Sequence, residues 1–262
     1  MAQVLVTGGT GFIASWCIVA LLDAGHDVRT TVRSLAREPR LRQTIHSGTE
    51  FDDTRLSVVR ADLESDEGWA DAVADLAPYQ RSKTLAEQAA WRFIDEEGGE
   101  MELAAVHPAA VIGPVLGPDD PPSLRIITGM LEGQLPACPP FGTSWVDVRD
   151  VADLHVRAMT DPAAAGGRWL AATGRGMRIV EVARILREQL GDRAAKAPTH
   201  ELPLPVARLL SRFNPGLRAL RPQLGKNFYA TGAKAERLLG WKPRPIEVTI
   251  AETAESLLAH GV

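Results

Sequence analysis

A glycine-rich turn near the start of the chain lies between two apolar segments of different length. Residues 3–6 form a short apolar run that predicts a buried strand, and residues 12–22 are apolar on most sides, as in a helix packed on a sheet. Glycines at such a junction let the backbone turn tightly and approach a pyrophosphate, whose charge then lies at the helix N-terminus. The turn therefore predicts a dinucleotide site, with an ordinary glycine-rich turn as the alternative. The candidate residues are Thr7, Gly8, Gly9, Thr10, Gly11, Phe12 and Ile13.

Strand and helix patterns alternate after this turn, as in successive βαβ units that build a parallel sheet. We expect a Rossmann-like, doubly wound α/β core over residues 1–112. Residues 113–262 are expected to form a smaller α/β portion that binds the substrate and returns some elements to the core. The further predicted strands cover residues 27–32 and 56–60, and the predicted helices cover residues 37–46 and 66–76.

The rest of the chain shows both helix and strand patterns, with many prolines after Gly113. Residues 79–97 predict a long helix that ends at Gly98, and residues 101–111 contain a strand. Asp150 is expected to cap the helix that it begins. Further strands are expected at residues 145–148 and 168–172, and further helices at residues 150–159, 179–190, 231–239 and 246–258.

Composition narrows the class of partner. The net charge of -4, without a block of lysines and arginines, argues against nucleic acid. The longest apolar stretches fall well short of the roughly 20 residues that span a bilayer, and the first strand follows Met1 too closely for a signal peptide. Cys17 and Cys138 form neither a disulfide framework nor a metal-ligand spacing. We therefore expect a soluble cytoplasmic protein with no metal ion and no membrane partner.

The residue after the second predicted strand bears on the choice of dinucleotide. Proteins that bind NAD usually carry an Asp or Glu here, which holds the ribose 2′-hydroxyl. This chain has Arg33 instead, with Arg29 and Arg37 nearby. A guanidinium suits a 2′-phosphate, so NADP(H) is favoured over NAD(H). After the third strand, Asp62 and Leu63 could hold the adenine edge, although an Asp that only caps a helix is the alternative.

Tyr79 and Lys83 are one helical turn apart, so their side chains are expected to project side by side. A phenol with a pKa near 10 is a poor acid at neutral pH. A neighbouring ammonium favours the phenolate and lowers the pKa of the phenol towards a useful range. The pair therefore predicts a proton-transfer site, and an ordinary solvent-facing Tyr/Lys pair is the alternative.

These features together resemble the extended short-chain dehydrogenase/reductase family, and within it the dihydroflavonol reductase and aldehyde/ketone reductase branch. The resemblance runs through nearly the whole chain. The matching segments are Val6-Thr-Gly-Gly-Thr-Gly-Phe-Ile13, Thr31-Val-Arg33, Ala61-Asp-Leu63, Tyr79-Gln-Arg-Ser-Lys-Thr-Leu-Ala-Glu87, His107-Pro-Ala-Ala-Val-Ile-Gly-Pro114 and Leu239-Gly-Trp-Lys-Pro-Arg244.

The resemblance implies a role for each matching residue. Tyr79 would donate a proton to a substrate carbonyl while NADPH delivers hydride. Lys83 would bind the nicotinamide ribose and lower the pKa of Tyr79. The stretch from Pro108 to Val111 would border the nicotinamide, and residues 139–145 would border the substrate. His107 is a lone histidine at this position, so it is expected to have a structural role and not a catalytic one.

The chain departs from the family between its third helix and Tyr79. The family has two further strands there, and the second ends in a catalytic Ser or Thr that binds the substrate oxygen. One βαβ unit takes about 30 residues, so a segment of very roughly twice that length is absent between Ala72 and Tyr79. Losing two central strands would open a hole of roughly 14 Å in the sheet. We therefore expect that the sequence is not contiguous here, which a normal Cα–Cα step of about 3.8 Å at every position would contradict.

Three functions remain open from the sequence. The first is an NADPH-dependent reductase of a small aldehyde or ketone, acting as a monomer or a homodimer. The second is a sugar-nucleotide epimerase or dehydratase, which a basic diphosphate site in the second half would support. The third is a non-catalytic regulator or degenerate scaffold that binds a dinucleotide, which a true loss of the Ser or Thr would support.

Overall fold

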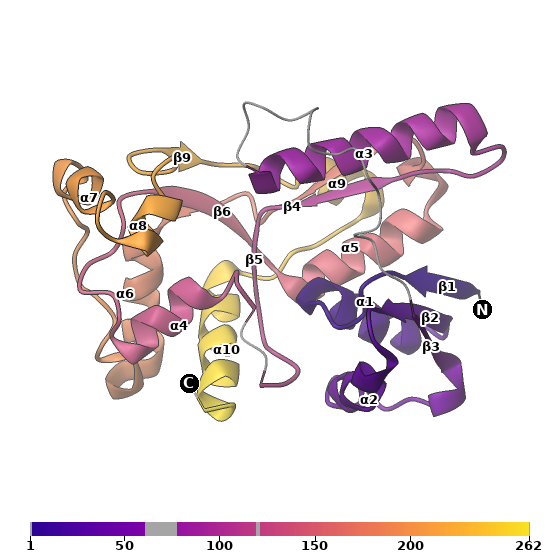
Figure 1. Cartoon of the computed structure of the whole chain (residues 1–262), viewed down its shortest axis with the longest axis horizontal. Coiled ribbons are helices and arrows are strands. Elements are labelled where there is room, and N and C mark those ends of the chain that lie inside the picture. Colours follow the sequence, from indigo (N-terminus) through magenta and orange to yellow (C-terminus); the bar gives the residue numbers. More distant parts are fainter. Residues whose placement is uncertain (1, 61–77, 119–120, 262) are drawn as a thin grey trace.

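The N-terminal strands and the helical elements of residues 179–219 lie at opposite ends of the molecule (Figure 1). The computed structural model describes residues 2–60, 78–118 and 121–261, and of residues 78–82 it describes the backbone only. The predicted helix over residues 66–76, together with Asp62 and Leu63, lies outside the described residues.

The first sheet is parallel and has the order β1-β2-β3. Its strands are β1 (Gln3–Val6), β2 (Asp27–Val32) and β3 (Leu56–Arg60), as predicted from their apolar runs. The connecting helices are α1 (Phe12–Asp23) and α2 (Glu38–His46). Both helices turn apolar residues towards the sheet, and the resulting core includes Ile18, Val28, Leu41, Ile45 and Leu56.

Later strands and helices pack against the first sheet and its helices. Strand β4 (Ala105–Pro108) pairs in parallel with β7 (Arg168–Ala171), and β5 (Ala110–Ile112) pairs in parallel with β6 (Gly142–Asp147). Helix α5 (Val148–Thr160) packs against α1, and α3 (Pro78–Glu97) lies on the opposite side of β4 (Figure 1). Helices on both faces of parallel strands define a Rossmann-like α/β fold. The division into two portions at residue 112 stays a prediction.

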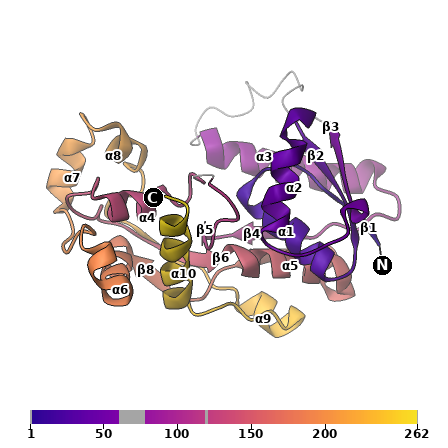
Figure 2. The same cartoon turned by 90° about the horizontal axis from the view of Figure 1, so that it is seen from below.

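At the other end of the molecule, α4, α6 and α10 enclose a second large core with Ile127, Leu186 and Ile250 (Figure 2). Among the described residues, none of the helices is both long and apolar enough to cross a bilayer. The other helices and strands are α4 (Arg125–Glu132), β8 (Gly176–Arg178), α6 (Ile179–Leu190), α7 (Leu204–Leu210), α8 (Pro215–Ala219), β9 (Asn227–Phe228), α9 (Ala233–Leu239) and α10 (Ile246–Ala259), with short 3-10 turns at Leu35–Arg37, Asp53–Arg55, Pro162–Ala164 and Gly191–Ala194.

The cap of α5 corrects one expectation. Asp147 caps the helix, because its Oδ1 accepts a hydrogen bond of 2.8 Å from the amide of Arg149. Asp150 lies inside the first turn and accepts hydrogen bonds from the backbone and side chain of Arg244 instead. The sequence offers an Asp at both positions, so only the point at which β6 ends decides between them.

Strand β1 lies at the edge of its sheet in the described part of the chain. Its partner there is β2, whereas β4 belongs to a different sheet with β7. Leu5 on β1 is 60% exposed, although a central strand of a doubly wound sheet is normally buried on both faces. The link from Ala72 to Tyr79 lies largely outside the described residues, so the expected break in the chain stays a prediction.

Candidate cofactor and catalytic site

The glycine-rich turn between β1 and α1 is held against the end of β2 by hydrogen bonds. The amide of Gly9 donates to the carbonyl of Thr31 at 3.0 Å, and the amide of Gly8 donates to its Oγ1 at 2.9 Å. Gly8 has a φ of 70°, which favours glycine. A Cβ on Gly9 would lie 2.2 Å from Oγ1 of Thr30, so a side chain at this position would collide with β2. Both glycines are therefore needed for the shape of the turn.

The N-terminus of α1 is open to an anion. Gly11 occupies the cap position with an extended backbone and makes no side-chain cap hydrogen bond. The first amides of a helix have no partner within the helix, and the helix dipole adds a partial positive charge. Amide donors and a positive dipole at one point suit a phosphate group. The turn thus fits the pyrophosphate of a dinucleotide.

A cavity of about 450 Å³ opens directly in front of this turn. One wall consists of residues 9–12 and Ser15, and a second consists of one face of α2 with the residues just before it. That second wall contributes two guanidinium groups, from Arg37 and Arg40. The cavity therefore combines a phosphate-binding turn with two cations that could hold another phosphate.

The third wall of the cavity comes from the segment after β5. Its lining includes Val115, Leu116 and Gly117. This segment is tied to the first helices, because Nε1 of Trp16 donates to the carbonyl of Pro114 at 3.0 Å, and Oγ of Ser47 donates to the carbonyl of Leu116 at 2.5 Å. The cavity is thus bounded on this side by residues that are distant in sequence from the turn.

The arginine predicted to select the cofactor does not line this cavity. Arg33 is exposed directly after β2, whereas Arg37 and Arg40 line the cavity wall. The sequence pattern pointed to Arg33, with Arg37 only as its neighbour, and did not point to Arg40. Arg37 and Arg40 could have been found together from their spacing, because residues three positions apart lie on one face of a helix. The segment 115–117 was also missed, because it is distant in sequence.

Tyr79 and Lys83 lie in the first two turns of α3, at the helical spacing that was predicted. Lys83 is exposed, and the side chain of Tyr79 lies outside the described part of the structure. The backbone therefore places the two residues on one face of α3. Among the described residues, those that line the cavity in front of Gly9 do not include Tyr79 or Lys83.

The next turn of α3 is fixed to the strands beside it. Oε1 of Glu87 accepts hydrogen bonds from Nε of Arg168 at 2.5 Å and from Nε1 of Trp91 at 3.1 Å. The Arg168 guanidinium also lies over the Trp91 ring, 5.1 Å from its centre. The hydrogen bond from Arg168 and the one from Trp91 lower the pKa of Glu87. A charged Glu87 therefore anchors the helix that carries Tyr79 and Lys83.

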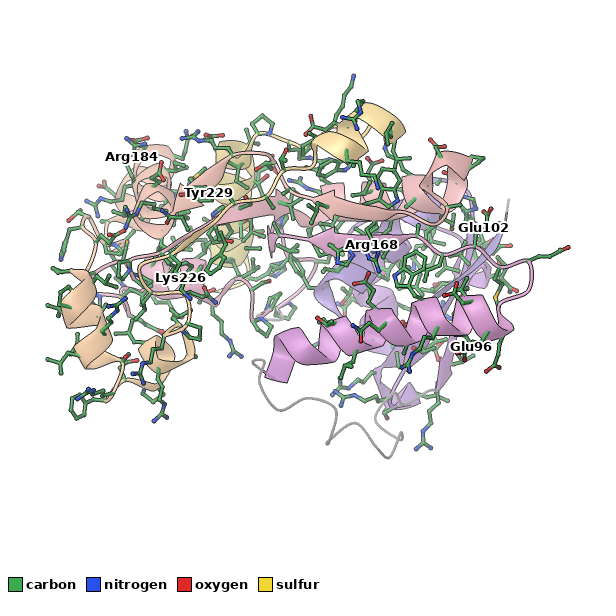
Figure 3. The ribbon with its side chains drawn as sticks, turned by 90° about the horizontal axis from the view of Figure 1, so that it is seen from above. Glu96, Glu102, Arg168, Arg184, Lys226 and Tyr229 are labelled. Carbon is green, nitrogen blue, oxygen red and sulfur yellow. The ribbon has the colours of Figure 1, made fainter. Side chains whose placement is uncertain are left out.

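His107 lies 3.5 Å from Oε1 of Glu87 through its Nε2 atom, which is buried and makes no hydrogen bond within the described structure. The contact places His107 in the anchor between β4 and α3. A structural role for His107 stays a prediction. Figure 3 shows Arg168 beside α3.

The remaining predicted residues lie apart from the phosphate turn. Pro108 lines a second cavity of about 310 Å³, together with Ser144, Leu170 and Tyr229. Val111 is buried in the core around Val146, Trp169 and Trp241 and lines neither of these two cavities. Of the predicted residues, the structure groups those of the turn, and it separates them from Pro108 and Val111.

A family model provides the first comparison with known proteins. The model of the NAD dependent epimerase/dehydratase family matches the chain in two pieces, residues 4–78 and 61–171. Together they cover more than half of the chain and include both the phosphate turn and α3. The two pieces overlap over residues 61–78, directly before Tyr79.

Two curated reductases align with this chain. Cinnamoyl-CoA reductase CAD2 of Medicago truncatula is 34% identical over 179 residues, which cover 68% of this chain and only 47% of that protein. Ketoreductase azaE of Aspergillus niger is 24% identical over 356 residues, covering 99% of this chain and 98% of that protein. The second alignment has 94 more positions than the 262 residues of the chain, so at least that many positions face a gap here.

A solved structure shares the whole fold. Gre2 from Candida albicans in complex with NADPH aligns with a TM-score of 0.72 and 19% identity, over 100% of this chain and 100% of that one. At this level of identity the likeness concerns the fold, and it agrees with the Rossmann-like arrangement described above.

Proposed function

The chain belongs to the NAD dependent epimerase/dehydratase family, and we propose that it is an NADP(H)-dependent reductase of a small aldehyde or ketone. Relatives of this chain are reductases. The observation that carries the proposal is the cavity in which the phosphate turn faces Arg37 and Arg40. A diphosphate on the turn and a 2′-phosphate on the arginines would account for the anionic groups of NADP(H), and the 2′-phosphate distinguishes it from NAD(H).

Each wall of the cavity has its own task. The open amides at the start of α1 would hold the pyrophosphate, and Gly9 keeps the backbone close enough for this. Arg37 and Arg40 would hold the ribose 2′-phosphate through charge-assisted hydrogen bonds. Arg33, at the end of β2, is proposed to add to the same positive field. The segment 115–117 would exclude water from one side of the bound group.

Proton transfer is assigned to α3. The bound nicotinamide would supply hydride to the carbonyl carbon. Tyr79 would donate its phenolic proton to the carbonyl oxygen, and the ammonium of Lys83 would lower the pKa of that phenol. Glu87 and Arg168 would keep the helix in place during this step, since their contact joins α3 to β7.

The complete enzyme is proposed to contain a further segment before Tyr79. It would fill the space beside β1, cover Leu5 and supply the Ser or Thr that binds the substrate oxygen. The exposed edge strand and the 94 unmatched alignment positions support this. An intact mass of the protein from its natural source tests it: a mass several kDa above that of the 262 residues is expected, and an equal mass would refute the extra segment.

The reductase proposal is tested by NADPH consumption with a panel of aldehydes and ketones. We expect at least one small, apolar carbonyl compound to be reduced, with one NADPH oxidised for each alcohol formed. Binding of NADPH without consumption across the panel would favour a dinucleotide-binding regulator. Turnover of a sugar nucleotide without net NADPH consumption would favour an epimerase.

A further inference from the structure

The segment from Leu202 to Ala235 has an unusual charge for this protein. It contains six basic residues and no Asp or Glu, whereas the whole chain has a net charge of -4. Helices α7 and α8 lie in this segment, at the end of the molecule farthest from β1 (Figure 1). The region around α7 and α8 therefore carries an excess of positive charge with no carboxylate of its own.

An apolar stripe faces solvent on α7 and the turn that follows it. Val206, Leu209, Leu210 and Phe213 follow the i, i+3, i+4, i+7 spacing of one helix face, and all four are exposed. Phe213 is 79% exposed and Leu209 is 56% exposed. The residues that α7 buries against the protein lie on another face and include Ala207. The apolar stripe is thus a second apolar face, beyond the one that the fold needs.

The arginines around this stripe differ from the arginines that the structure holds against carboxylates. Arg149 and Arg178, for example, are held in ion pairs with carboxylates. Arg208, Arg212 and Arg218 are exposed, and within the described residues no ion pair holds them. Arg221 shares both properties. Figure 3 shows Lys226 and Tyr229 at the same end of the molecule.

We propose that α7 and α8 dock the protein onto an anionic lipid surface. An exposed apolar face bordered by arginines lets the apolar side chains enter the boundary between headgroups and acyl chains while the guanidinium groups contact phosphates. This goes beyond the proposed reductase function and does not depend on it. It differs from a membrane span, because α7 has only seven residues.

Two other occupants fit the surface less well. A nucleic acid would use the arginines but would leave Leu209 and Phe213 exposed, and the net charge of the chain opposes it. A second copy of the chain would bury the stripe against itself, but would bring two clusters of unpaired arginines together. Negative phospholipid satisfies both the charge and the apolar stripe.

Vesicle co-sedimentation of the full chain tests the proposal. Wild-type protein should bind vesicles of phosphatidylglycerol and phosphatidylcholine, and not vesicles of phosphatidylcholine alone. Replacing Leu209 and Phe213 by Asp should lower the partition coefficient about tenfold or more, because the apolar insertion is lost. Replacing Arg208 and Arg212 by Gln should lower it about fivefold for each arginine, and added salt should have the same effect.

Matched controls lie on α9, which carries another exposed leucine and arginine. Leu238→Asp and Arg237→Gln should leave vesicle binding unchanged, and circular dichroism should show that all variants are folded. Absence of wild-type binding, equal binding to neutral vesicles, or equal loss in the α9 controls would overturn the proposal. Self-association of the protein without vesicles would also overturn the proposal if Phe213→Asp abolished it, because the apolar stripe would then bind a second copy of the chain.

Discussion

Arg168 on β7 donates a hydrogen bond of 2.5 Å to Glu87 on α3, and so joins the strand to the helix that carries Tyr79 and Lys83. The two residues are 81 positions apart in the sequence. Glu87 is the last residue of the segment Tyr79–Glu87 that resembles the family. The Tyr and Lys serve the proposed chemistry, whereas the Glu, two turns from the Tyr, fixes the helix on which both depend.

Glu87→Gln should reduce stability at neutral pH and not in acid. The hydrogen bond from Arg168 lowers the pKa of Glu87 in the folded protein, so its stabilising effect is present above the unfolded pKa of about 4.3 and is lost as the pH falls through the folded pKa. Arg168 is 63% exposed, which limits the effect to at most about 1 kcal/mol. Urea unfolding across this pH range measures it. Glu96→Gln on the same helix is the control, and an equal loss in both variants would contradict the anchor.

Gly9→Ala should destabilise the phosphate turn. The added Cβ would lie 2.2 Å from Oγ1 of Thr30, and overpacking of this kind costs about 1–3 kcal/mol. Thr30→Ala removes the colliding hydroxyl, so the double variant should recover part of the lost stability. A double-mutant cycle of unfolding free energies measures this recovery. Gly117→Ala, whose Cβ would meet Thr44 only at 3.6 Å, is the control within the same cavity. Additive effects at positions 9 and 30 would show that the collision is not the cause.

Arg37→Ser and Arg40→Ser should each weaken NADPH binding about 10- to 100-fold, the range expected for one lost charge-assisted hydrogen bond. NADH binding should change little, because NADH lacks the 2′-phosphate. Fluorescence titration with both dinucleotides measures this, and Arg33→Ser is expected to change NADPH binding in the same direction. Arg29→Ser, on β2 and not in the cavity lining, should have no effect. Equal losses for NADH and NADPH would exclude a role for these arginines in cofactor choice.

The two thiols should be unreactive in the folded protein. Burial raises the pKa of Cys17 to about 12, and burial, followed by the nearby charge of Glu201, raises that of Cys138 to about 11. Near pH 8 almost none of either thiol is ionised, and the thiolate is the reactive form. A thiol reagent should therefore label both cysteines only after urea unfolding. Rapid labelling of one equivalent in native protein would contradict this burial.

The sequence predicted the elements whose apolar pattern is local. Strands β1 to β3 and helix α6 begin and end where their apolar runs do. The cap of α5 was placed at Asp150 instead of Asp147, because the end of β6 depends on its pairing with β5. The short helices α7 and α8 were not foreseen, since an apolar face that points to solvent gives no core signal.

The candidate site was predictable in its turn and in the spacing of Tyr79 and Lys83, which are local features. Arg40 and the segment 115–117 were not, because only the tertiary fold brings α2 and the chain after β5 to the same cavity. The anchor at Glu87 was missed for the same reason, since its partner Arg168 comes from a distant strand.

Proton donation by Tyr79 is the central claim, and Tyr79→Phe is its most direct test. NADPH oxidation with a reducible aldehyde should fall by about 10²- to 10⁴-fold, the usual contribution of a general acid, while the dissociation constant for NADPH stays unchanged. Gln80→Ala on the neighbouring position of α3 is the matched control and should keep its turnover. An unchanged rate in Tyr79→Phe, with NADPH still bound, would contradict the account.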